Sequence, residues 1–454
     1  MAISNDIRVQ VSTALRDRNP WWQDPVSRPS VPPMRRDLHG LLLRRIADLS
    51  DRRASLLVGP RQVGKTTLLL QLAVDLLDRG WPPRNLVYFD FSDDRLPTRI
   101  SPRVVVDAVP GPISESKPRI LLLDEICRSE NWSSWLKQSV DRTIDRIIAT
   151  DSAASVLRHE SLESGAGRWD EHVLEGTSFG EYLRLQSRQG ESEADVLSRL
   201  PNAVNRYLTI GGFPEHRLAD DLATVRQRLR DDISDRAIRR DLAQLHPDVE
   251  IDQVRRLMVS IAQGSGDIFD AANRAKKLGA DPRSVRSWVH LVEETGLVRR
   301  LDRRTGSPVS NLASRPKLYA FDPGIITAFC LAASPLDEAG VRGRLWEAAV
   351  FRHLREAARE LRGEISYLRE KNDLEVDFVV DLAQQRVAIE VTTSEDPETR
   401  KLRRVRRGAE RIGAKIRLAI CATPELQSRE GIELVPLRAF LLSPGALLSG
   451  AGRP

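Results

Sequence analysis

Cysteine is scarce in this sequence. Its 454 residues include three cysteines, Cys127, Cys330 and Cys421, which lie far apart and have neither paired nor metal-ligand spacing. This argues against a disulfide framework and against a cysteine-based metal site, and it fits a reducing compartment.

Long apolar segments are missing too. No apolar run approaches the roughly 18 residues that a membrane span needs, and the N-terminal residues MAISNDIRVQ lack the apolar core of a signal peptide. We therefore expect a soluble, cytoplasmic protein without membrane contact.

Lysine is also rare, and arginine vastly outnumbers it. The net charge of +6 and the pI near 9.4 suggest a modest attraction to polyanions. Because the arginine excess is spread over the whole chain, a single arginine cluster is weak evidence for a nucleic-acid site. The length exceeds what one core supports, and the hydrophobic content of 41% favours two to four packed domains.

One stretch carries a specific motif. Residues 59–67 read GPRQVGKTT, follow the apolar run 54–58 and match G-x-x-x-x-G-K-[ST] in full. Glycines let backbone N–H groups surround phosphate oxygens, and the N-terminus of the following helix faces the anion. We expect Lys65, the first lysine in the chain, to reach the β- and γ-phosphates and Thr66 to bind Mg²⁺. The predicted ATP contacts in this loop are Gly59, Pro60, Arg61, Gln62, Val63, Gly64, Lys65, Thr66 and Thr67.

Three short apolar segments, 86–90, 120–123 and 146–150, predict buried strands. Their alternation with helical patterns predicts a parallel sheet covered on both faces, with ligand at the carboxyl ends of the strands. Asp124 and Glu125 end the second strand. We expect Asp124 to hold hydrated Mg²⁺ and Glu125 to polarise the attacking water.

Two further groups complete the predicted nucleotide site. After the third strand, Thr150, Asp151 and Ser152 offer a polar group that senses the γ-phosphate, and Thr150 is the one we assign to the site. Arg168 is a candidate arginine finger that acts on its own site or on a neighbour's. A surface role for Arg168 remains an open alternative in so arginine-rich a chain.

The flanking segments are read from their patterns. Residues 19–22, NPWW, belong to a polar, proline-rich arm, and we expect the tryptophan pair to dock on the following domain, with partner binding as the alternative. A helix is expected over 35–49. Residues 181–250 predict helices of a lid or subunit contact, with one apolar stripe. The stripe consists of Leu222, Val225, Leu229 and Ile233.

Residues 251–305 predict a winged helix. Its expected parts are helices over 267–278 and 282–295 and a wing strand over 296–301. Arginines 283 and 286 would lie on the exposed front of the second helix. DNA contact and a purely connecting role remain equal alternatives.

Several motifs together resemble a prokaryotic family of AAA-type ATPases. They are NPWW, GPRQVGKTT, LLLDEI, GRWDEHVLEGTSFGEYLRL, the turn IGGFP at 210–214, Arg240-Asp241 and YAFDPG at 319–324. The resemblance implies an α/β fold with a P-loop parallel-sheet ATPase core, a helical lid, a winged helix and a C-terminal α/β domain similar to restriction-endonuclease-like nucleases. It also implies a homo-oligomer, as a ring or a dimer. The expected domains are an arm at 1–50, the ATPase core at 51–180, the lid at 181–250, the winged helix and linker at 251–318, and the nuclease-like domain at 319–454.

Acids in the last domain have nuclease-like spacing. Glu347 lies on an expected helix, and Asp377 and Glu390 lie on two expected strands that would bring them together around Mg²⁺. A lysine two residues after the glutamate would help to activate water, but that position is Thr392. The set is therefore incomplete, and we expect a structural or binding descendant of the fold rather than an active nuclease.

An expected helix beyond these strands, over 400–412, combines an apolar stripe with a basic outer face. Binding of a phosphate backbone and a plain solvated surface are equal alternatives for it. The basic residues are Arg400, Lys401, Arg403, Arg404, Arg406, Arg407 and Arg411.

These observations favour an ATP- and Mg²⁺-dependent ATPase that acts as a nucleotide-gated switch on DNA or on a protein partner. The alternatives are a DNA-binding regulator or adaptor with little turnover and an ATP-gated magnesium nuclease.

Overall fold

The computed structural model describes residues 5–48, 50–96, 100–151, 167–188, 190–217, 219, 221–243, 246, 248–305, 314–370 and 374–450. The chain divides into two compact units, Met1–Glu175 and Gly176–Pro454. In the described part of the chain, no helix combines the length and the apolar character that crossing a bilayer requires.

The first unit is built on a parallel five-stranded sheet. Its strands are β1 (Ala54–Val58), β2 (Leu86–Asp90), β3 (Ile120–Asp124), β4 (Arg146–Asp151) and β5 (Trp169–Val173). Their spatial order is β2-β3-β4-β1-β5, and every pairing is parallel. β1, β3 and β4 are buried along their whole length, as their apolar runs predict. The three predicted strands and the parallel α/β sheet are confirmed, whereas β5 was not predicted.

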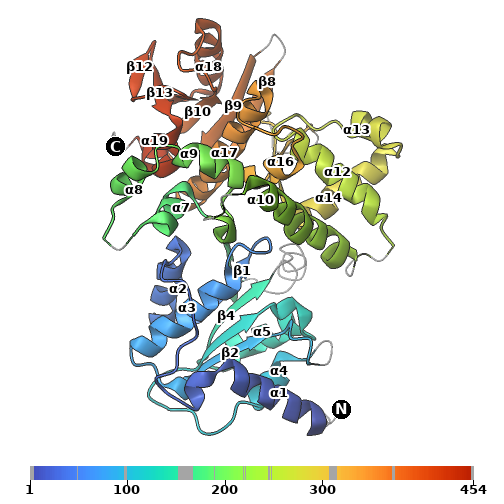
Figure 1. Cartoon of the computed structure of the whole chain (residues 1–454), viewed down its shortest axis with the longest axis vertical. Helices are drawn as coiled ribbons and strands as arrows, with labels where there is room; N and C mark the ends of the chain where they lie inside the picture. The colour runs from blue at the N-terminus through green and yellow to red at the C-terminus, as the bar shows by residue number, and fades with distance from the viewer. Residues whose placement is uncertain are drawn as a thin grey trace. The chain divides into compact units, whose positions relative to one another are not determined.

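Helices cover both faces of this sheet (Figure 1). α3 lies on one face, and α4 and α5 lie on the other, as right-handed crossovers between parallel strands require. The predicted helix at 35–49 is present as a shorter helix, and α1 was not predicted. The helical segments are α1 (Asn5–Arg18), η1 (Pro20–Trp22), α2 (Asp37–Ala47), α3 (Lys65–Asp78), η2 (Pro83–Asn85), α4 (Pro102–Asp107), η3 (Ile126–Arg128) and α5 (Trp132–Arg142).

The NPWW segment docks on β2, an edge strand of the sheet. Asn19 bonds the backbone of Tyr88 as a neighbouring strand would: its Oδ1 accepts from the Tyr88 N–H at 2.7 Å, and its Nδ2 donates to the Tyr88 carbonyl at 2.8 Å. The indoles of Trp21 and Trp22, both buried, donate to the Leu86 carbonyl. The prediction that the tryptophans dock on the following domain is confirmed, and the segment protects the sheet edge.

The second unit begins with helices. They are α7 (Phe179–Gln186), α8 (Glu193–Arg199), α9 (Ala203–Ile210), η4 (Pro214–His216), α10 (Leu222–Arg228) and the π-helices η5 (Leu229–Asp235) and η6 (Ala237–Leu242). The helical content expected for 181–250 is confirmed. Val225, Leu229 and Ile233 are buried, but Leu222 is 38% exposed and does not belong to the buried stripe.

Three helices and a two-stranded antiparallel sheet follow. They are α12 (Ile251–Gln263), α13 (Ala271–Leu278), α14 (Pro282–Glu294), β6 (Val298–Leu301) and β7 (Lys317–Ala320). α13 and α14 each begin after an aspartate, Asp270 or Asp281, whose side chain accepts backbone N–H groups of the first turn. The predicted helices and wing strand are present within a few residues, and their identity as a winged helix stays a prediction.

The C-terminal part of the second unit contains a mixed six-stranded sheet. Its strand order is β12-β13-β11-β10-β9-β8, with antiparallel β8, β9 and β10 followed by parallel β10, β11 and β13. The elements are α16 (Pro323–Phe329), α17 (Ala339–Glu360), β8 (Glu364–Glu370), β9 (Leu374–Asp381), β10 (Arg386–Val391), α18 (Thr399–Ile412), β11 (Ile416–Cys421), β12 (Gln427–Arg429), β13 (Ile432–Pro436), α19 (Leu437–Leu442) and α20 (Pro444–Ser449). The helix and the two strands expected to carry the acids are therefore present.

Two motifs without evident chemistry, GGFP and FDPG, fit against each other. The Asp322 carboxylate caps α16 by accepting from the Gly324 N–H at 2.8 Å, and it also accepts from the Gly212 N–H at 2.9 Å. A Cβ at Gly211, whose φ is +76°, would lie 1.8 Å from Asp322 Oδ1. These glycines are therefore required by packing, and the motifs join α9 to α16.

Candidate functional site

The phosphate loop joins the carboxyl end of β1 to α3. Gly64 precedes α3 with a left-handed φ of +98°, and a Cβ at Gly59 would lie 2.1 Å from the Leu174 carbonyl oxygen. Both positions therefore need glycine. Within the loop Pro60 and Val63 are buried, Arg61 and Thr67 are half-buried, and Gln62 is exposed. The strand, loop and helix order that the motif requires is present.

Lys65 is buried beneath this loop, with 7% of its surface exposed. Its ammonium donates to the carbonyl oxygens of Gly59 at 2.8 Å and Pro60 at 2.7 Å. Burial lowers the pKa of Lys65, although nearby carboxylates, Glu125 first among them, oppose that shift. Carbonyl dipoles do not neutralise the charge, so an anion next to this ammonium is favoured.

Thr66 and Asp124 meet at the predicted magnesium position. The Thr66 hydroxyl donates to Asp124 Oδ2 at 2.6 Å, and the Thr150 hydroxyl donates to Asp124 Oδ1. Burial raises the pKa of Asp124, and the bonds from the two threonines oppose that shift. The Tyr88 hydroxyl also donates to Asp124 Oδ2, at 3.2 Å, and was missed because Tyr88 stands inside an apolar strand. The hydroxyl and carboxylate are hard oxygen ligands and fit Mg²⁺.

Thr150 links Asp124, the last residue of β3, to Glu125, which follows it. Besides its bond to Asp124, its hydroxyl accepts from the Glu125 backbone N–H at 3.0 Å. Glu125 has a left-handed φ of 53°, and its Oε2 lies 3.6 Å from Arg128 Nε. β4 lies between β1 and β3, which is why Thr150 can reach across to Asp124 and Glu125. This link depends on the order of the strands in the sheet, which the sequence motifs do not reveal.

Arg36 also contacts the phosphate loop, a role that its sequence context did not indicate. Arg36, just before α2, donates to the carbonyl oxygens of Val63 at 2.9 Å and Glu175 at 3.0 Å. It therefore holds the loop from outside, and nothing in the arginine-rich arm distinguishes it.

The other two candidates for sensing the γ-phosphate are Asp151 and Ser152. Asp151 Oδ1 accepts from the Cys127 thiol. Ser152, a third candidate for sensing phosphate, lies outside the described residues.

Arg168 lies at the wrong end of the sheet for its own phosphate loop. Its carbonyl accepts from the Ala54 N–H, at the amino end of β1, whereas the loop follows Val58. Four residue steps along a strand separate these ends by roughly 13 Å. The Arg168 guanidinium pairs with Asp141 at 3.0 Å. The expectation that Arg168 acts on its own site is wrong, and action on a neighbour's site stays a prediction.

The C-terminal acids meet around a lysine that the sequence did not reveal. Lys317 Nζ lies 3.3 Å from Glu347, 3.4 Å from Glu375 and 3.5 Å from Asp377. Burial alone would lower the pKa of Lys317, but the three carboxylates outweigh it and raise that pKa above its usual value. Tyr319, two residues on in β7, donates to Glu347 Oε1 at 2.6 Å.

Glu390 and Thr392 lie on the adjacent strand β10 and just beyond it. Glu390 is 6% exposed, its Oε2 has no hydrogen-bond partner in the described structure, and its Oε1 is 3.8 Å from Arg404. Burial and the Asp377 charge raise the pKa of Glu390. The Thr392 hydroxyl accepts from Lys401 Nζ at 3.2 Å. Lys401 and Arg404 therefore face inward to these residues and do not extend the exposed basic face expected for α18.

A divalent ion does not fit the C-terminal acids as they stand. The Lys317 ammonium already lies between two of the three expected ligands, Glu347 and Asp377. Across the described residues, no group of three or more His, Cys, Asp or Glu side chains is arranged to hold a metal ion. The buried lysine, rather than a metal, neutralises this cluster.

Comparison with known families identifies the first module. Residues 51–183 match the AAA domain, so the chain carries an AAA-type P-loop domain with the α/β fold of nucleotide-binding ATPases. Residues 201–337 and 342–440 match two domains of unknown function, DUF8612 and DUF4143.

Relatives and solved structures extend over most of the chain. An uncharacterized protein of Methanocaldococcus jannaschii is 23% identical over 329 residues, which cover 71% of this chain and 70% of the relative. An uncharacterized protein of Mycobacterium tuberculosis is 26% identical over 350 residues, covering 75% and 70%. Among solved structures, a Walker-type ATPase of Pyrococcus abyssi is 13% identical with a TM-score of 0.42 and covers 67% of this chain and 98% of that one. The Aeropyrum pernix ORC2 protein is 13% identical with a TM-score of 0.37, covering 69% and 97%.

Proposed function

We propose that this protein is a magnesium-dependent ATPase that works as a nucleotide-gated switch on DNA or on a protein partner. The observation that carries the proposal is the Thr66–Asp124 pair, joined at 2.6 Å at the start of α3, next to a buried ammonium that has only carbonyl partners in its loop. A divalent cation and a triphosphate are complementary to these two features.

Each side chain has a defined part in this proposal. Lys65 would bind the β- and γ-phosphate oxygens in place of the loop carbonyls. Thr66 and Asp124 would hold the metal, which would supply positive charge to offset that of the phosphates. Glu125, fixed through its backbone by Thr150 at 3.0 Å, orients the attacking water. The gate is the chain of contacts from Thr66 through Asp124 to Thr150, because metal binding competes with the bond between the first two.

Arg168 can contribute only from another subunit, because it lies at the amino end of β5. A homo-oligomer in which Arg168 reaches a neighbour's phosphates would supply the missing transition-state cation. Replacing Arg168 with alanine should then slow hydrolysis without weakening ATP binding, and inactive Glu125→Gln subunits mixed with Arg168→Ala subunits should restore some turnover.

The central test is ATP turnover by the Glu125→Gln variant. We expect ATP binding to be retained, because Glu125 does not hold the phosphates, and hydrolysis to fall by roughly 10²-fold or more. Glu130→Gln, an exposed acid nearby, is the matched control and should hydrolyse ATP like the parent. A Glu125→Gln protein that turns over ATP at the parental rate would refute the assigned role.

A second candidate is a nucleotide-binding regulator with little turnover. It is favoured by the contact between Glu125 Oε2 and Arg128 Nε, at 3.6 Å, because an ion pair at the proposed base competes with the water that this base would orient. If this contact restrains hydrolysis, Arg128→Ala should hydrolyse ATP faster than the parent. If turnover is brisk already and Arg128→Ala leaves it unchanged, the switch driven by hydrolysis is the better description.

The ATP-gated magnesium nuclease is the weakest alternative. Its expected ligands Glu347 and Asp377 share the Lys317 ammonium, and Thr392 replaces the lysine that would activate water. DNA cutting that depends on Mg²⁺ and disappears in Asp377→Asn would revive it.

A further inference from the structure

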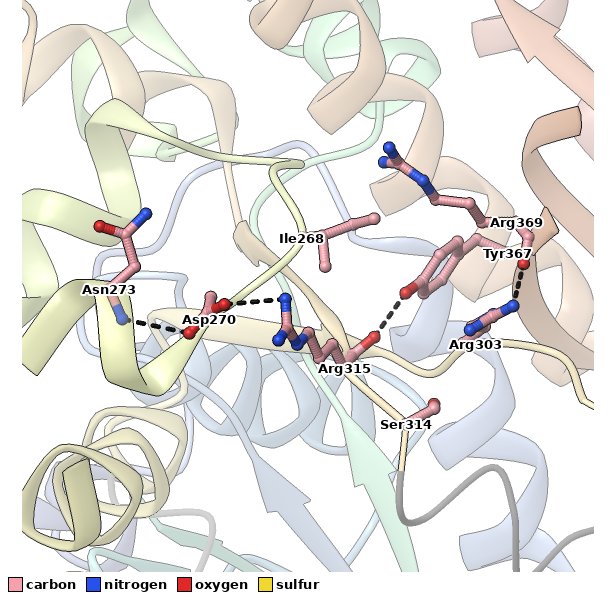
Figure 2. A pocket seen from close by; sticks show the side chains of 8 residues that line it. All are labelled: Ile268, Asp270, Asn273, Arg303, Ser314, Arg315, Tyr367 and Arg369. Atoms are coloured by element: carbon pink, nitrogen blue, oxygen red, sulfur yellow. Dashed lines mark hydrogen bonds and ion pairs between the residues drawn. The ribbon is translucent and has the colours of Figure 1, made fainter. Parts of the chain in front are cut away.

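A cavity of about 670 Å³ lies in the second unit, far along the chain from the phosphate loop (Figure 2). Its walls come from the start of α13, from both ends of the loop between β6 and β7, and from β8. The lining residues are Ile268, Asp270, Asn273, Arg303, Ser314, Arg315, Tyr367 and Arg369. Three of them are arginines.

Backbone bonds hold these walls together. Arg303 pairs with Tyr367, and Ile268 pairs with Lys317, as isolated β-bridges. The Tyr367 N–H donates to the Asp302 carbonyl at 3.0 Å, and the Tyr367 hydroxyl donates to the Arg315 carbonyl. The cavity is therefore a pre-formed part of the fold, which lowers the ordering cost of binding a ligand.

The lining has more hydrogen-bond donors than acceptors. The Arg303 guanidinium donates to the Arg369 carbonyl through one nitrogen, and its buried Nε has no partner in the described structure. Arg315 pairs with Asp270 at 2.8 Å but stays 70% exposed, and Arg369 lies 3.6 Å from Glu375 and stays 54% exposed. Each guanidinium has five N–H donors, so most of these donors have no protein acceptor in the described structure.

We propose that this cavity binds a phosphate group of a nucleic-acid strand. Planar guanidinium groups bind phosphate oxygens through paired hydrogen bonds, and the three that line this cavity come from separate segments, so together they offer donors to successive phosphates of one strand. The inference names the partner class of the proposed switch and to that extent rests on the proposed function. It does not require ATP hydrolysis.

A nucleic-acid strand fits the cavity better than a free nucleotide does. Tyr367 is 1% exposed and the Lys317 ammonium lies over its ring at 5.5 Å, so no aromatic face is available to stack on a base. Basic residues continue outside the cavity instead. Asn273 lines it, and Lys276 and Lys277, three and four residues further along α13, lie on the same side of the helix and are exposed. A strand held at the cavity can therefore extend along α13.

Binding should be measured with the full-length Lys65→Ala protein, so that ATP-site effects are absent. The probes are fluorescein-labelled single-stranded and double-stranded oligonucleotides, followed by anisotropy at several salt concentrations. Inorganic phosphate and a nucleoside monophosphate, followed by calorimetry, separate a strand from a free phosphate ester.

The pocket variant is Arg303→Gln/Arg369→Gln. We expect it to bind the oligonucleotide roughly 10-fold more weakly at low salt and to reduce the salt slope by about two, one for each arginine that no longer neutralises a phosphate. Lys276→Gln/Lys277→Gln should weaken binding less. The control is Arg228→Gln/Arg359→Gln, which removes the same charge from exposed positions of α10 and α17 and should change little.

Circular dichroism checks that the variants fold. If the double variant does not fold, Arg369→Gln alone removes only the 3.6 Å interaction with Glu375 and carries the same test with about half the effect. Equal weakening in the pocket and control variants would overturn the proposal, because general charge would then explain it. Binding of the monophosphate without binding of either oligonucleotide would overturn it in favour of a small ligand. If the parent protein hydrolyses ATP but the Lys65→Ala protein binds no oligonucleotide, this site is refuted and the ATPase proposal stays intact.

Discussion

Each of the two units contains a buried lysine, and the two lysines have different partners. Lys65 is 7% exposed and donates to two backbone carbonyls, whereas Lys317 is 3% exposed and is surrounded by three carboxylates. The pKa of Lys65 is lowered, and the pKa of Lys317 is raised. At a similar degree of burial, the two lysines therefore have pKa values that are shifted in opposite directions.

The difference separates a site that needs a ligand from one that is complete. Two carbonyl dipoles satisfy hydrogen bonds of Lys65, but burial lowers its pKa in spite of the nearby carboxylates, so a bound phosphate would stabilise its charge. Lys317 already has more negative charge around it than it carries. We infer that Lys65 is a ligand-binding cation and that Lys317 is a structural cation, and the predictions that follow test this contrast.

The largest effect is expected from Lys317→Met. Methionine preserves most of the side-chain volume but removes the cation that three acids share, of which only Glu375 keeps another among the described residues, Arg369 at 3.6 Å. Removing one partner of a buried ionic cluster costs about 3–5 kcal/mol. We expect the free energy of unfolding, measured by urea denaturation, to fall by that amount. Lys415→Met, at an exposed lysine of the same unit, is the control and should cost little. Equal stabilities of Lys317→Met and the parent would show that the acids need no cation.

Lys65→Ala should do the opposite: a large effect on function and a small one on folding. Loss of the ammonium that binds the phosphates should reduce ATP turnover roughly 10²–10³-fold. Stability without nucleotide should change little, because the cost of burying the ammonium offsets its two hydrogen bonds. Colorimetric phosphate release and urea denaturation measure the two quantities, with Lys137→Ala of α5 as the control. A Lys65→Ala protein that unfolds as easily as Lys317→Met would remove the contrast.

The third prediction exchanges one cation for another. In Lys317→Ala, Mn²⁺ can take the place of the ammonium, since the three oxygens lie 3.3–3.5 Å from Nζ and need to move inward by roughly 1 Å to reach metal-ligand distance. Saturating Mn²⁺ should raise the free energy of unfolding of this variant by about 1–2 kcal/mol. The parent should not respond through this cluster, and Lys317→Ala/Asp377→Asn should lose the response. A response of the parent that Asp377→Asn abolishes would mean that the acids bind metal despite Lys317.

The contrast also explains what the sequence could predict. The loop with its helix and the Asp124-Glu125 pair are two short motifs, each contiguous in the chain although 58 residues separate Thr66 from Asp124. Their patterns predicted β1, α3 and β3 and assigned Lys65, Thr66 and Asp124 to one site. Glu347, Asp377 and Glu390 were also found, each on its expected element. Short-range patterns report elements and the residues at their ends reliably.

Interactions made by tertiary packing were missed. Lys317 lies 30 residues before Glu347 and 60 before Asp377, and nothing in its own segment indicates that β7 delivers it to these acids. Tyr88 and Arg36 reach the nucleotide site in the same way, from an apolar strand and from an arginine-rich arm. Arg168 was misplaced because β5 was not predicted, and only the strand fixes which end of the sheet that residue occupies.

The smallest effects concern pH, and they again oppose each other in the two units. In the second unit, burial and the Asp377 charge raise the pKa of Glu347 from 4.5 to about 7. The folded protein therefore keeps a proton that the unfolded chain releases, so the stability that Glu347 contributes is fully present below pH 4.5 and is lost as the pH rises to about 7. In the first unit, burial lowers the pKa of His172 from 6.5 to about 4. The unfolded chain then binds the extra proton, and stability is lost as the pH falls from 6.5 to 4.

Thermal unfolding of the parent, Glu347→Gln and His172→Gln at several pH values separates the two contributions. The stability advantage of the parent over Glu347→Gln should shrink as the pH rises from 4.5 to 7, while its advantage over His172→Gln should grow from pH 4 to 6.5. Each change should be on the order of 1–2 kcal/mol, less than the full pKa shifts imply, because the Glu347 side chain is 21% exposed and His172 is only partly buried. If the advantage over Glu347→Gln does not shrink as the pH rises, then burial and the Asp377 charge do not hold a proton on Glu347, and the acid cluster around Lys317 lacks the excess negative charge inferred for it.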